Sequence, residues 1–494
     1  MANPLQTLER FFRTAPDAPR RDLPPRKLHR VYEFNRWSVF LSVTFGYGVY
    51  YVGRLSFSVI KKPLLDESVL NATEMGLIGS ALLICYAIGK LANGFLADRA
   101  NIRRFMSAGL LVVAAVNGLL GFAPGFFAFL LLWGVNGWVQ SIGAPSSIVS
   151  LSRWFSPRER GSRYGVWCIS HNLGEGLSFV VTAAVASWLG WRWGFFAPAV
   201  ACAVTALVLT RTLKDRPESI GLPPVTEFRD DPAPTEIAGE SVGHMQSLVL
   251  RNPAIWVLGL ASALMYVSRY AINNWGALVL QEGKGHSLMD AGTILAVYAI
   301  AGGAGSFLSG ILSDAFFRSR RNLPCLLAGV VQVASLTALW WIPPGHPWLD
   351  AVAISVFGFA MGILVSFLGG LMAIDIVSPR AAGAAAGVVG MFSYVGAAIQ
   401  DALSGWLIDQ GRVVHDTTVH LNVSGLADFC SALGTDLAAF VGPEALDAPC
   451  PVVVRDVSYS FAQPFAFWIG ASVLSVLLPL LIWKAGDRAL GREK

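Results

Sequence analysis

The stretch GFLADRANIRR, residues 94–104, decides the fold of this chain, because it recurs as GILSDAFFRSRR at residues 310–321. The aspartates of the two stretches, Asp98 and Asp314, are 216 positions apart. A second pair, SPRERGSRYGV at 156–166 and SPRAAGAAAGV at 378–388, repeats at an offset of 222. Matches at nearly one offset indicate that the chain contains two copies of one structural unit.

Long apolar segments flank these repeats and predict a membrane protein. Of the 494 residues, 54% are hydrophobic and 14% are charged, which excludes an ordinary soluble domain with its roughly 25% of charged residues. Segments of about 20 apolar residues can cross a bilayer as helices. We expect six spans in each half, at 36–60, 74–97, 104–123, 126–152, 161–189 and 191–212, and at 253–280, 288–313, 322–342, 349–376, 382–408 and 462–485.

The basic residues set the expected orientation, because cytoplasmic loops of membrane proteins are rich in Lys and Arg. With the N-terminus in the cytoplasm, 28 of the 37 bases fall in cytoplasmic segments and 6 in outer loops, Lys61 and Lys62 among them. We expect no cleavable signal peptide, because the first thirty residues are basic and Pro-rich and contain no apolar segment. We therefore expect a monomeric, multi-pass protein of the inner cell membrane with both termini in the cytoplasm. The net charge of +5 is too small to suggest a nucleic-acid partner.

These patterns predict an all-α fold with 12 transmembrane helices in two six-helix bundles related by pseudo-two-fold symmetry. The expected domains are a cytoplasmic segment at 1–35, a first bundle at 36–212, a linker at 213–250 and a second bundle at 253–486. The Pro-rich, charged linker is typical of a flexible tether. A long outer loop at 409–461 holds Cys430 and Cys450, which could form a disulfide in an oxidising compartment.

Three bases remain inside the predicted spans, and they are Arg54, Lys90 and Arg269. A charge at membrane depth costs at least ~2.5 kcal/mol and indicates a functional site. Arg54 and Arg269 are 215 residues apart, so they occupy the same place in the two halves. Polar residues lie near them at helical spacing on their own helices: Tyr50 near Arg54, and Tyr266 and Asn273 near Arg269. Arginine forks bind tetrahedral oxyanions, so we expect a phosphorylated ligand.

The fifth span contributes His171, Asn172 and Glu175 to the expected site. His171 and Glu175 share a helix face at i, i+4 spacing. Two readings stay open for two of the bases: Lys90 could contact the ligand or extend toward the cytoplasmic surface, and His171 could contact the ligand or pack between helices. Glu175 and Asp401 are candidates for charge compensation or proton coupling.

The loop GFLADRANIRR resembles the loop signature of the major facilitator superfamily, and its glycine, aspartate and arginines match the expected positions. The resemblance implies a gating element that closes the cytoplasmic side, made of Gly94, Asp98, Arg99, Arg103, Arg104 and Asp314. Four further stretches, YGVYYVGRLSFSVIKKPLL (47–65), CYAIGKLANGFLADR (85–99), WCISHNLGEG (167–176) and YVSRYAINNWG (266–276), resemble the organophosphate:phosphate antiporter family. The hexose-phosphate sensor branch looks closest.

This resemblance implies that Arg54 and Arg269 bind a phosphoryl group and that Lys90 and His171 assist. The chain departs from the family pattern at Asn274, where an aspartate is common, and at Gln400 and Asp401, where hexose-phosphate carriers place a lysine. The expected function is exchange of a phosphorylated metabolite, such as glucose-6-phosphate or glycerol-3-phosphate, for inorganic phosphate by alternating access.

Two other functions stay open. The chain could be a membrane sensor that binds hexose phosphate and signals to a histidine kinase, or a proton-coupled carrier of another organic anion. No nucleophile triad, phosphate loop or metal-ligand spacing is present in the sequence, so we expect neither an enzyme nor a metal or cofactor.

Overall fold

The computed structural model describes residues 10–230, 249–317, 321–376, 382–421 and 450–483. Within these ranges the chain folds into two bundles of long helices, as expected. The first bundle comprises α2 (Pro25–Val59), α3 (Lys61–Asp66), α4 (Ala72–Arg99), α5 (Ile102–Leu120), α6 (Phe126–Gln140), α7 (Gly143–Trp154), α8 (Pro157–Leu189) and α9 (Trp193–Thr212).

The second bundle contains more interruptions than the first. It comprises α12 (Pro253–Tyr270), η2 (Ala271–Trp275), α13 (Gly276–Leu278), η3 (Val279–Gly283), α14 (Leu288–Phe317), α15 (Asn322–Trp341), α16 (Pro347–Ser366), η4 (Phe367–Leu371), α17 (Met372–Asp375), α18 (Ala382–Gln410), α20 (Ala462–Leu477) and η7 (Leu478–Ile482). The segments η2, η3 and η4 are π-helical turns, which widen a helix by one residue and often occur at functional sites.

The helices are long and apolar enough for a membrane protein. Among the described residues, nine helical segments meet a length and hydropathy criterion for crossing a membrane. Three other long helices, α2, α8 and α18, have 35, 33 and 29 residues. The described helices are therefore consistent with twelve spans, and the all-α expectation for the membrane part is confirmed.

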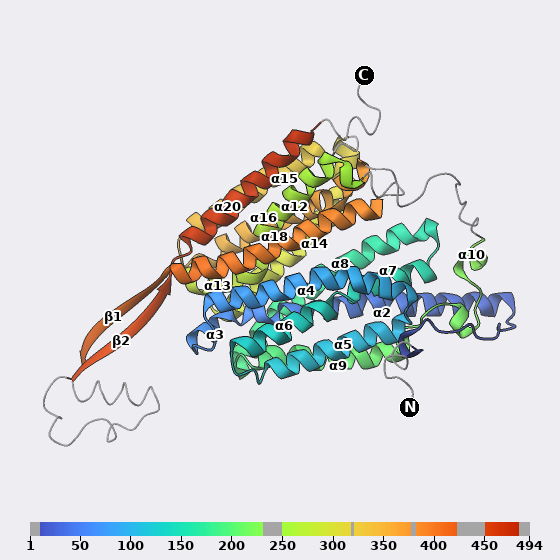
Figure 1. The fold of residues 1–494 in the computed structure, drawn as a ribbon, viewed down its shortest axis with the longest axis horizontal. Helices are drawn as coiled ribbons and strands as arrows, with labels where there is room; N and C mark the ends of the chain where they lie inside the picture. Colours follow the sequence, from blue (N-terminus) through green and yellow to red (C-terminus); the bar gives the residue numbers. More distant parts are fainter. Residues whose placement is uncertain (1–9, 231–248, 318–320, 377–381, 422–449, 484–494) are drawn as a thin grey trace, which may run out of the picture.

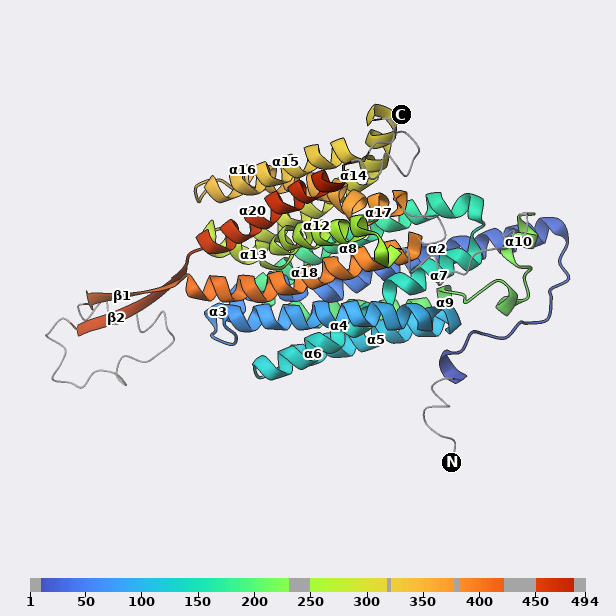
Figure 2. The same ribbon diagram turned by 45° about the horizontal axis from the view of Figure 1, so that its top comes forward.

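The ends of the molecule differ. A two-stranded antiparallel ribbon, β1 (Arg412–Leu421) and β2 (Cys450–Tyr459), projects from one end in both views (Figures 1 and 2). We call this the ribbon end, and the opposite end, which carries α10 (Val225–Phe228), the α10 end. The ribbon occupies part of the predicted 409–461 loop. Cys430 and the side chain of Cys450 lie outside the described residues, so the disulfide stays a prediction.

The two bundles touch mainly along two helix pairs, α4 with α18 and α8 with α14. Their helices lie close together near the ribbon end and diverge toward the α10 end (Figure 1). Three contacts close the ribbon end. Lys62 of α3 hydrogen-bonds to Glu282 of η3, and Asp409 of α18 accepts the N–H groups of Ala72 and Thr73, at 3.2 and 2.6 Å. The third contact joins Lys61 and Asp401, whose side chains are both buried.

The first part of the linker is not a flexible tether, and this expectation is wrong for residues 213–230. The ring of Phe228 stacks on Tyr32 with 3.7 Å between centroids. Arg229 binds Glu33 at 3.1 Å and Glu159 at 2.7 Å. Phe228 and Arg229 thus hold this segment against the first bundle, one through its aromatic ring and the other through its charge. Their partners lie far away in the sequence, so composition alone does not reveal these contacts. Residues 231–248 lie outside the described ranges.

Candidate functional site

Arg54 lies on α2 and is buried between the two bundles. Its guanidinium donates a hydrogen bond to the hydroxyl of Tyr270, on α12, at 2.7 Å. The guanidinium carbon also lies 4.5 Å from the ring centroid of Tyr86 and 5.6 Å from that of Tyr51. Aromatic faces attract a guanidinium electrostatically. Among the described residues, Arg54 has no carboxylate within ion-pair distance, so its charge is left for a ligand to neutralise.

Arg269 is at the end of α12, next to Tyr270, and its guanidinium carbon lies 5.5 Å from the ring of Tyr266. It lines a cavity with an empty volume of about 290 Å³. The fifth-span residues His171, Asn172 and Glu175 line the same cavity, opposite Tyr298 of α14. The structure therefore brings Arg269 and all three predicted polar residues of α8 together, although they come from different bundles.

A chain of hydrogen bonds through Asn273 joins two residues that line this cavity, Tyr298 and Glu175. The hydroxyl of Tyr298 donates to Oδ1 of Asn273 at 2.6 Å, and Nδ2 of Asn273 donates to Oε1 of Glu175 at 2.5 Å. The π-helical turn η2 orients Asn273 toward Glu175 and Asn274 toward Asp401, which an ordinary α-helical turn would place differently.

Lys90 of α4 is exposed, and its ammonium lies 5.4 Å from the ring centroid of Tyr394 on α18. The ring of Tyr394 also packs against Tyr86, the ring beside Arg54, at 4.8 Å between centroids, and against Tyr266, the ring beside Arg269, at 5.8 Å. Lys90 thus faces the same group of tyrosines as the two arginines. His171 lies 5.7 Å, ring to ring, from Tyr51.

Tyr50 is not part of this site, and the sequence prediction is wrong here. Its hydroxyl donates to the carbonyl of Met106 at 3.0 Å, inside the first bundle. A side chain at Gly109 would occupy the space of the Tyr50 hydroxyl. The gap left by this glycine takes Tyr50 away from Arg54, and the next residue, Tyr51, faces Arg54 instead.

Asp401 lies apart from the Arg269 cavity. Its carboxylate accepts hydrogen bonds from Asn274 at 2.9 Å and from the indole of Trp275 at 2.6 Å. It also lies 3.8 Å from the ammonium of Lys61, a residue that is only 1% exposed. Lys61 lies in the connection between α2 and α4, as expected, but the structure buries its side chain, so a fourth base lies between the bundles.

Lys62, the neighbour of Lys61, stays nearer the surface at the ribbon end. Burial lowers its pKa, but hydrogen bonds to Glu282 and Asp66 outweigh burial and raise the pKa above the ordinary value. Its charge is thus held by these carboxylates, one of which belongs to the second bundle.

The gating motif lies at the α10 end. Thr14 donates to the carbonyl of Arg99 through its backbone N–H and its hydroxyl, at 3.0 and 2.8 Å. Arg104 donates to the carbonyl of Phe11 at 2.8 Å. Gly94 has open space around it and Arg103 is partly exposed. The side chains of Asp98 and Asp314 lie outside the described residues, so the expected latch through them stays a prediction.

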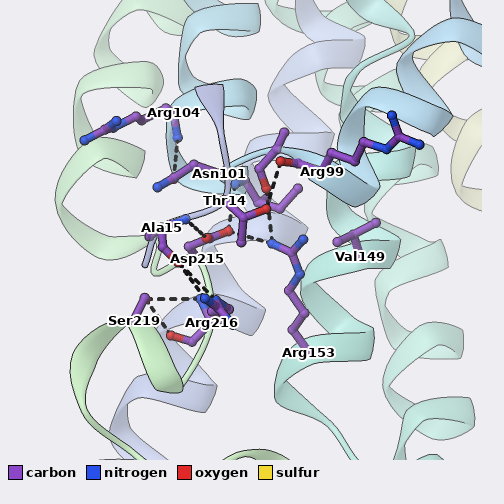
Figure 3. Close-up of polar contacts among 12 residues, drawn as sticks. Thr14, Ala15, Arg99, Asn101, Arg104, Val149, Arg153, Asp215, Arg216 and Ser219 are labelled. Carbon is purple, nitrogen blue, oxygen red and sulfur yellow. Dashed lines mark hydrogen bonds and ion pairs between the residues drawn. The ribbon is translucent and has the colours of Figure 1, made fainter. Parts of the chain in front are cut away.

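Figure 3 shows what organises this end of the first bundle. The buried carboxylate of Asp215 accepts hydrogen bonds from the backbone of Ile102 at 2.9 Å, from Ala15 at 3.0 Å and from Arg153 at 2.6 Å. One linker residue therefore ties the N-terminal segment, the start of α5 and the end of α7 together. The sequence-based prediction considered only the Lys and Arg residues of the loops, so it did not identify Asp215.

The sequence analysis also missed the tyrosines Tyr51, Tyr270, Tyr298 and Tyr394. Only 11 tyrosines occur in the chain, and their clustering inside apolar spans was the available signal. In the described part of the chain, no group of three His, Cys, Asp or Glu side chains is arranged to hold a metal ion.

Comparisons with known proteins agree on the kind of molecule. The model of the Major Facilitator Superfamily matches residues 43–400. The membrane sensor protein UhpC of Salmonella typhimurium is 34% identical over 81% of this chain and 91% of its own length. The glycerol-3-phosphate transporter of Bacillus subtilis is 33% identical over 81% and 92%, and a probable hexose phosphate transport protein of Chlamydia trachomatis is 32% identical over 76% and 85%.

Among solved structures, a bacterial homologue of the human lysosomal transporter Spinster, in an inward-facing and unoccupied conformation, aligns with a TM-score of 0.67. The alignment covers 93% of this chain and 98% of that protein at 17% sequence identity. This likeness concerns the fold.

Proposed function

Since the chain belongs to the major facilitator superfamily, in its organophosphate:phosphate antiporter branch, we propose that it exchanges a phosphorylated small metabolite for inorganic phosphate across a membrane. The substrates are sugar phosphates such as glucose-6-phosphate, or glycerol-3-phosphate. In this proposal the protein is a carrier and has no enzymatic activity. It places the protein in the inner cell membrane with the α10 end in the cytoplasm, because the basic residues of the loops gather there.

The observation that carries the proposal is the environment of the two arginines. Arg54 and Arg269 come from different bundles and stand among tyrosines. Arg54 lies 4.5 Å from the ring centroid of Tyr86 and Arg269 lies 5.5 Å from that of Tyr266, and both rings pack against Tyr394. A phosphoryl group carries about −1.5 to −2 charges at neutral pH, which matches two arginines. Such a dianion can bridge the bundles and stabilise the conformation in which they close around it.

Exchange rather than leakage follows from the charges. Without ligand, two carboxylates lie near the positive charges among the described site residues: Glu175 lines the cavity of Arg269, and Asp401 lines the cavity that Arg54 shares with Lys61. Three bases thus face two carboxylates. Closing the bundles around unneutralised like charges costs free energy, and a bound dianion offsets this cost. The empty protein should therefore change its conformation slowly, and the loaded protein quickly. In the conformation described here, contacts between the bundles close the ribbon end.

The test uses proteoliposomes loaded with [32P]phosphate. External glucose-6-phosphate, glycerol-3-phosphate or a phosphoglycerate should accelerate phosphate efflux at least tenfold over buffer, and unphosphorylated glucose should not. If no phosphorylated compound accelerates efflux although the protein is folded, exchange is refuted.

Sensing is the second candidate function, and the similarity to UhpC, named a membrane sensor protein, favours it. The same arginines would bind the ligand, so the binding site does not separate the two functions. Tight binding of glucose-6-phosphate without phosphate efflux would identify a sensor that signals to a partner such as a histidine kinase. A proton-coupled carrier would instead show pH-driven uptake that needs no internal phosphate, with Glu175 as the carboxylate at the site.

A further inference from the structure

A second cavity lies on the ribbon-end side of Arg54. Its empty volume is about 300 Å³, and its polar lining is Arg54, Ser58, Lys61, Tyr270, Asn274 and Asp401. Arg54 and Ser58 are one turn apart on α2, and Lys61 follows where α3 begins. Arg54 therefore contacts the tyrosines of the candidate site and also lines this cavity, which lies nearer the ribbon end.

Lys61 presents an unsatisfied ammonium group to this cavity. Its side chain is 1% exposed, and its ammonium has no hydrogen-bond acceptor among the described residues. The nearest carboxylate oxygen, Oδ1 of Asp401, is 3.8 Å away, which is beyond hydrogen-bond distance. An ammonium group has three donors, and a buried one without acceptors is unfavourable unless a ligand supplies them. The indole ring of Trp275, at 3.2 Å, provides only cation–π stabilisation.

Asp401 does not hydrogen-bond to Lys61, because its carboxylate is held by Asn274 and Trp275 in a position 3.8 Å from the ammonium. It fits against α4 only because residue 79 is glycine: a Cβ there would lie 1.6 Å from Oδ2 of Asp401. The carboxylate is thus fixed in place by the second bundle and by this close approach, while Lys61 belongs to the first bundle.

The charges of this cavity do not cancel. Arg54 and Lys61 contribute two positive charges and Asp401 one negative charge, which leaves a net charge of +1. The Arg269 cavity, by contrast, contains Glu175 beside its arginine. An anion therefore finds uncompensated positive charge on the side of Arg54 that faces the ribbon end.

We propose that Arg54, Ser58 and Lys61 form a second site for the phosphoryl group, between the transport site and the ribbon end. A phosphoryl group in this site gives the ammonium of Lys61 the hydrogen-bond acceptors that it lacks. The phosphoryl group and the carboxylate of Asp401 then compete for this ammonium. Because Lys61 and Asp401 belong to different bundles, this competition loosens the closure of the ribbon end. The inference rests on the proposed function, since phosphate is the ligand in both.

The experiment measures equilibrium binding of [32P]phosphate to the purified full-length protein in lipid nanodiscs. Asp401→Asn removes the competitor and leaves Lys61, so phosphate should bind at least fivefold more tightly than to the wild type. Lys61→Met with Asp401→Asn removes both charges and leaves no buried unpaired charge, so phosphate should bind at least tenfold more weakly. If the single variant Asp401→Asn does not fold, the double variant Lys61→Met with Asp401→Asn tests the proposal by itself.

The matched control is Lys62→Met with Glu282→Gln, which removes the neighbouring ion pair between the bundles. This pair does not line the cavity, so its loss should change phosphate affinity less than threefold. The subsite is refuted if Lys61→Met with Asp401→Asn binds phosphate within threefold of the wild type, or if a folded Asp401→Asn variant binds no more tightly. A wild-type protein that binds no phosphate would refute the proposed function itself.

Discussion

The guanidinium of Arg54 donates a hydrogen bond to the hydroxyl of Tyr270, 216 residues away in the other bundle, at 2.7 Å. This bond joins the two bundles through a residue that we assign to ligand binding. A ligand that takes over the donors of Arg54 must therefore break a contact between the bundles. Binding and conformational change are linked at this one group.

Tyr270→Phe tests this link. A hydrogen bond to a charged group contributes about 1.5–3 kcal/mol, and in the wild type phosphate must replace it. Since 1.4 kcal/mol corresponds to about a factor of ten, the variant should bind phosphate at least about tenfold more tightly in equilibrium binding. Tyr32→Phe is the control, because the buried hydroxyl of Tyr32 has no hydrogen-bond partner among the described residues. Affinity that falls more than tenfold would instead make Tyr270 a direct phosphate ligand.

Glu175→Gln should increase phosphate affinity and slow exchange. The carboxylate partly neutralises Arg269 in the empty site, so its loss leaves more positive charge for the phosphoryl group. We expect a Kd about tenfold lower, and a lower maximal exchange rate because release becomes slower. Both are measured with [32P]phosphate. Asp290→Asn, the same change at an exposed position on α14, should alter neither quantity. Unchanged affinity in Glu175→Gln would contradict the role in charge compensation.

Asp409→Ala should open the ribbon end. Asp409 caps the first N–H groups of α4 from the second bundle, and a cap is worth about 1 kcal/mol. This free energy exists only while the ribbon end is closed, so its loss shifts the equilibrium about fivefold toward the open state. Pulsed electron paramagnetic resonance between spin labels at Ser68 and His346, both exposed, measures the populations.

Asn71→Ala is the matched control for this shift. Asn71 caps the same helix, through Glu74, but within the first bundle. Its loss should lower stability without changing the distance distribution. Equal distributions for Asp409→Ala and the wild type would show that this cap does not contribute to closure.

Asp215→Ala should detach the N-terminal segment from the first bundle. Breaking a buried ion pair costs about 3–5 kcal/mol, and Asp215 also accepts the N–H groups of Ile102 and Ala15. We expect a lower unfolding temperature and faster trypsin cleavage after Arg13. Asp17→Ala removes only an exposed ion pair with Arg216 and should change little. Wild-type cleavage in Asp215→Ala would contradict the organising role of this aspartate.

The sequence predicted the features that repeat or follow a local period. The duplicated motifs indicated two bundles, and the three bases inside apolar spans indicated a binding site, which stays a prediction; in the structure all three bases lie near tyrosines that pack against one another. Such features depend on spacing along one helix or on charge in an apolar segment, and both are visible without the fold.

The features that the sequence missed depend on partners far away in the chain. Lys61 follows a span and reads as a loop residue, but it is buried because Asp401, 340 residues later, faces it. Tyr50 and Tyr51 both lie about one turn before Arg54, and the gap at Gly109 decides which of them faces the site. The linker was misread because the partners of Asp215 and Arg229 lie on other helices.

The central claim is that Arg54 and Arg269 bind one phosphoryl group through their planar forks, and exchange by Arg269→Lys in proteoliposomes tests it most directly. Lysine keeps the charge but cannot donate two parallel hydrogen bonds to a tetrahedral oxyanion. Exchange of [32P]phosphate should fall at least tenfold in folded protein, while the exposed control Arg192→Lys exchanges as the wild type does. Wild-type exchange rates in Arg269→Lys would contradict the claim.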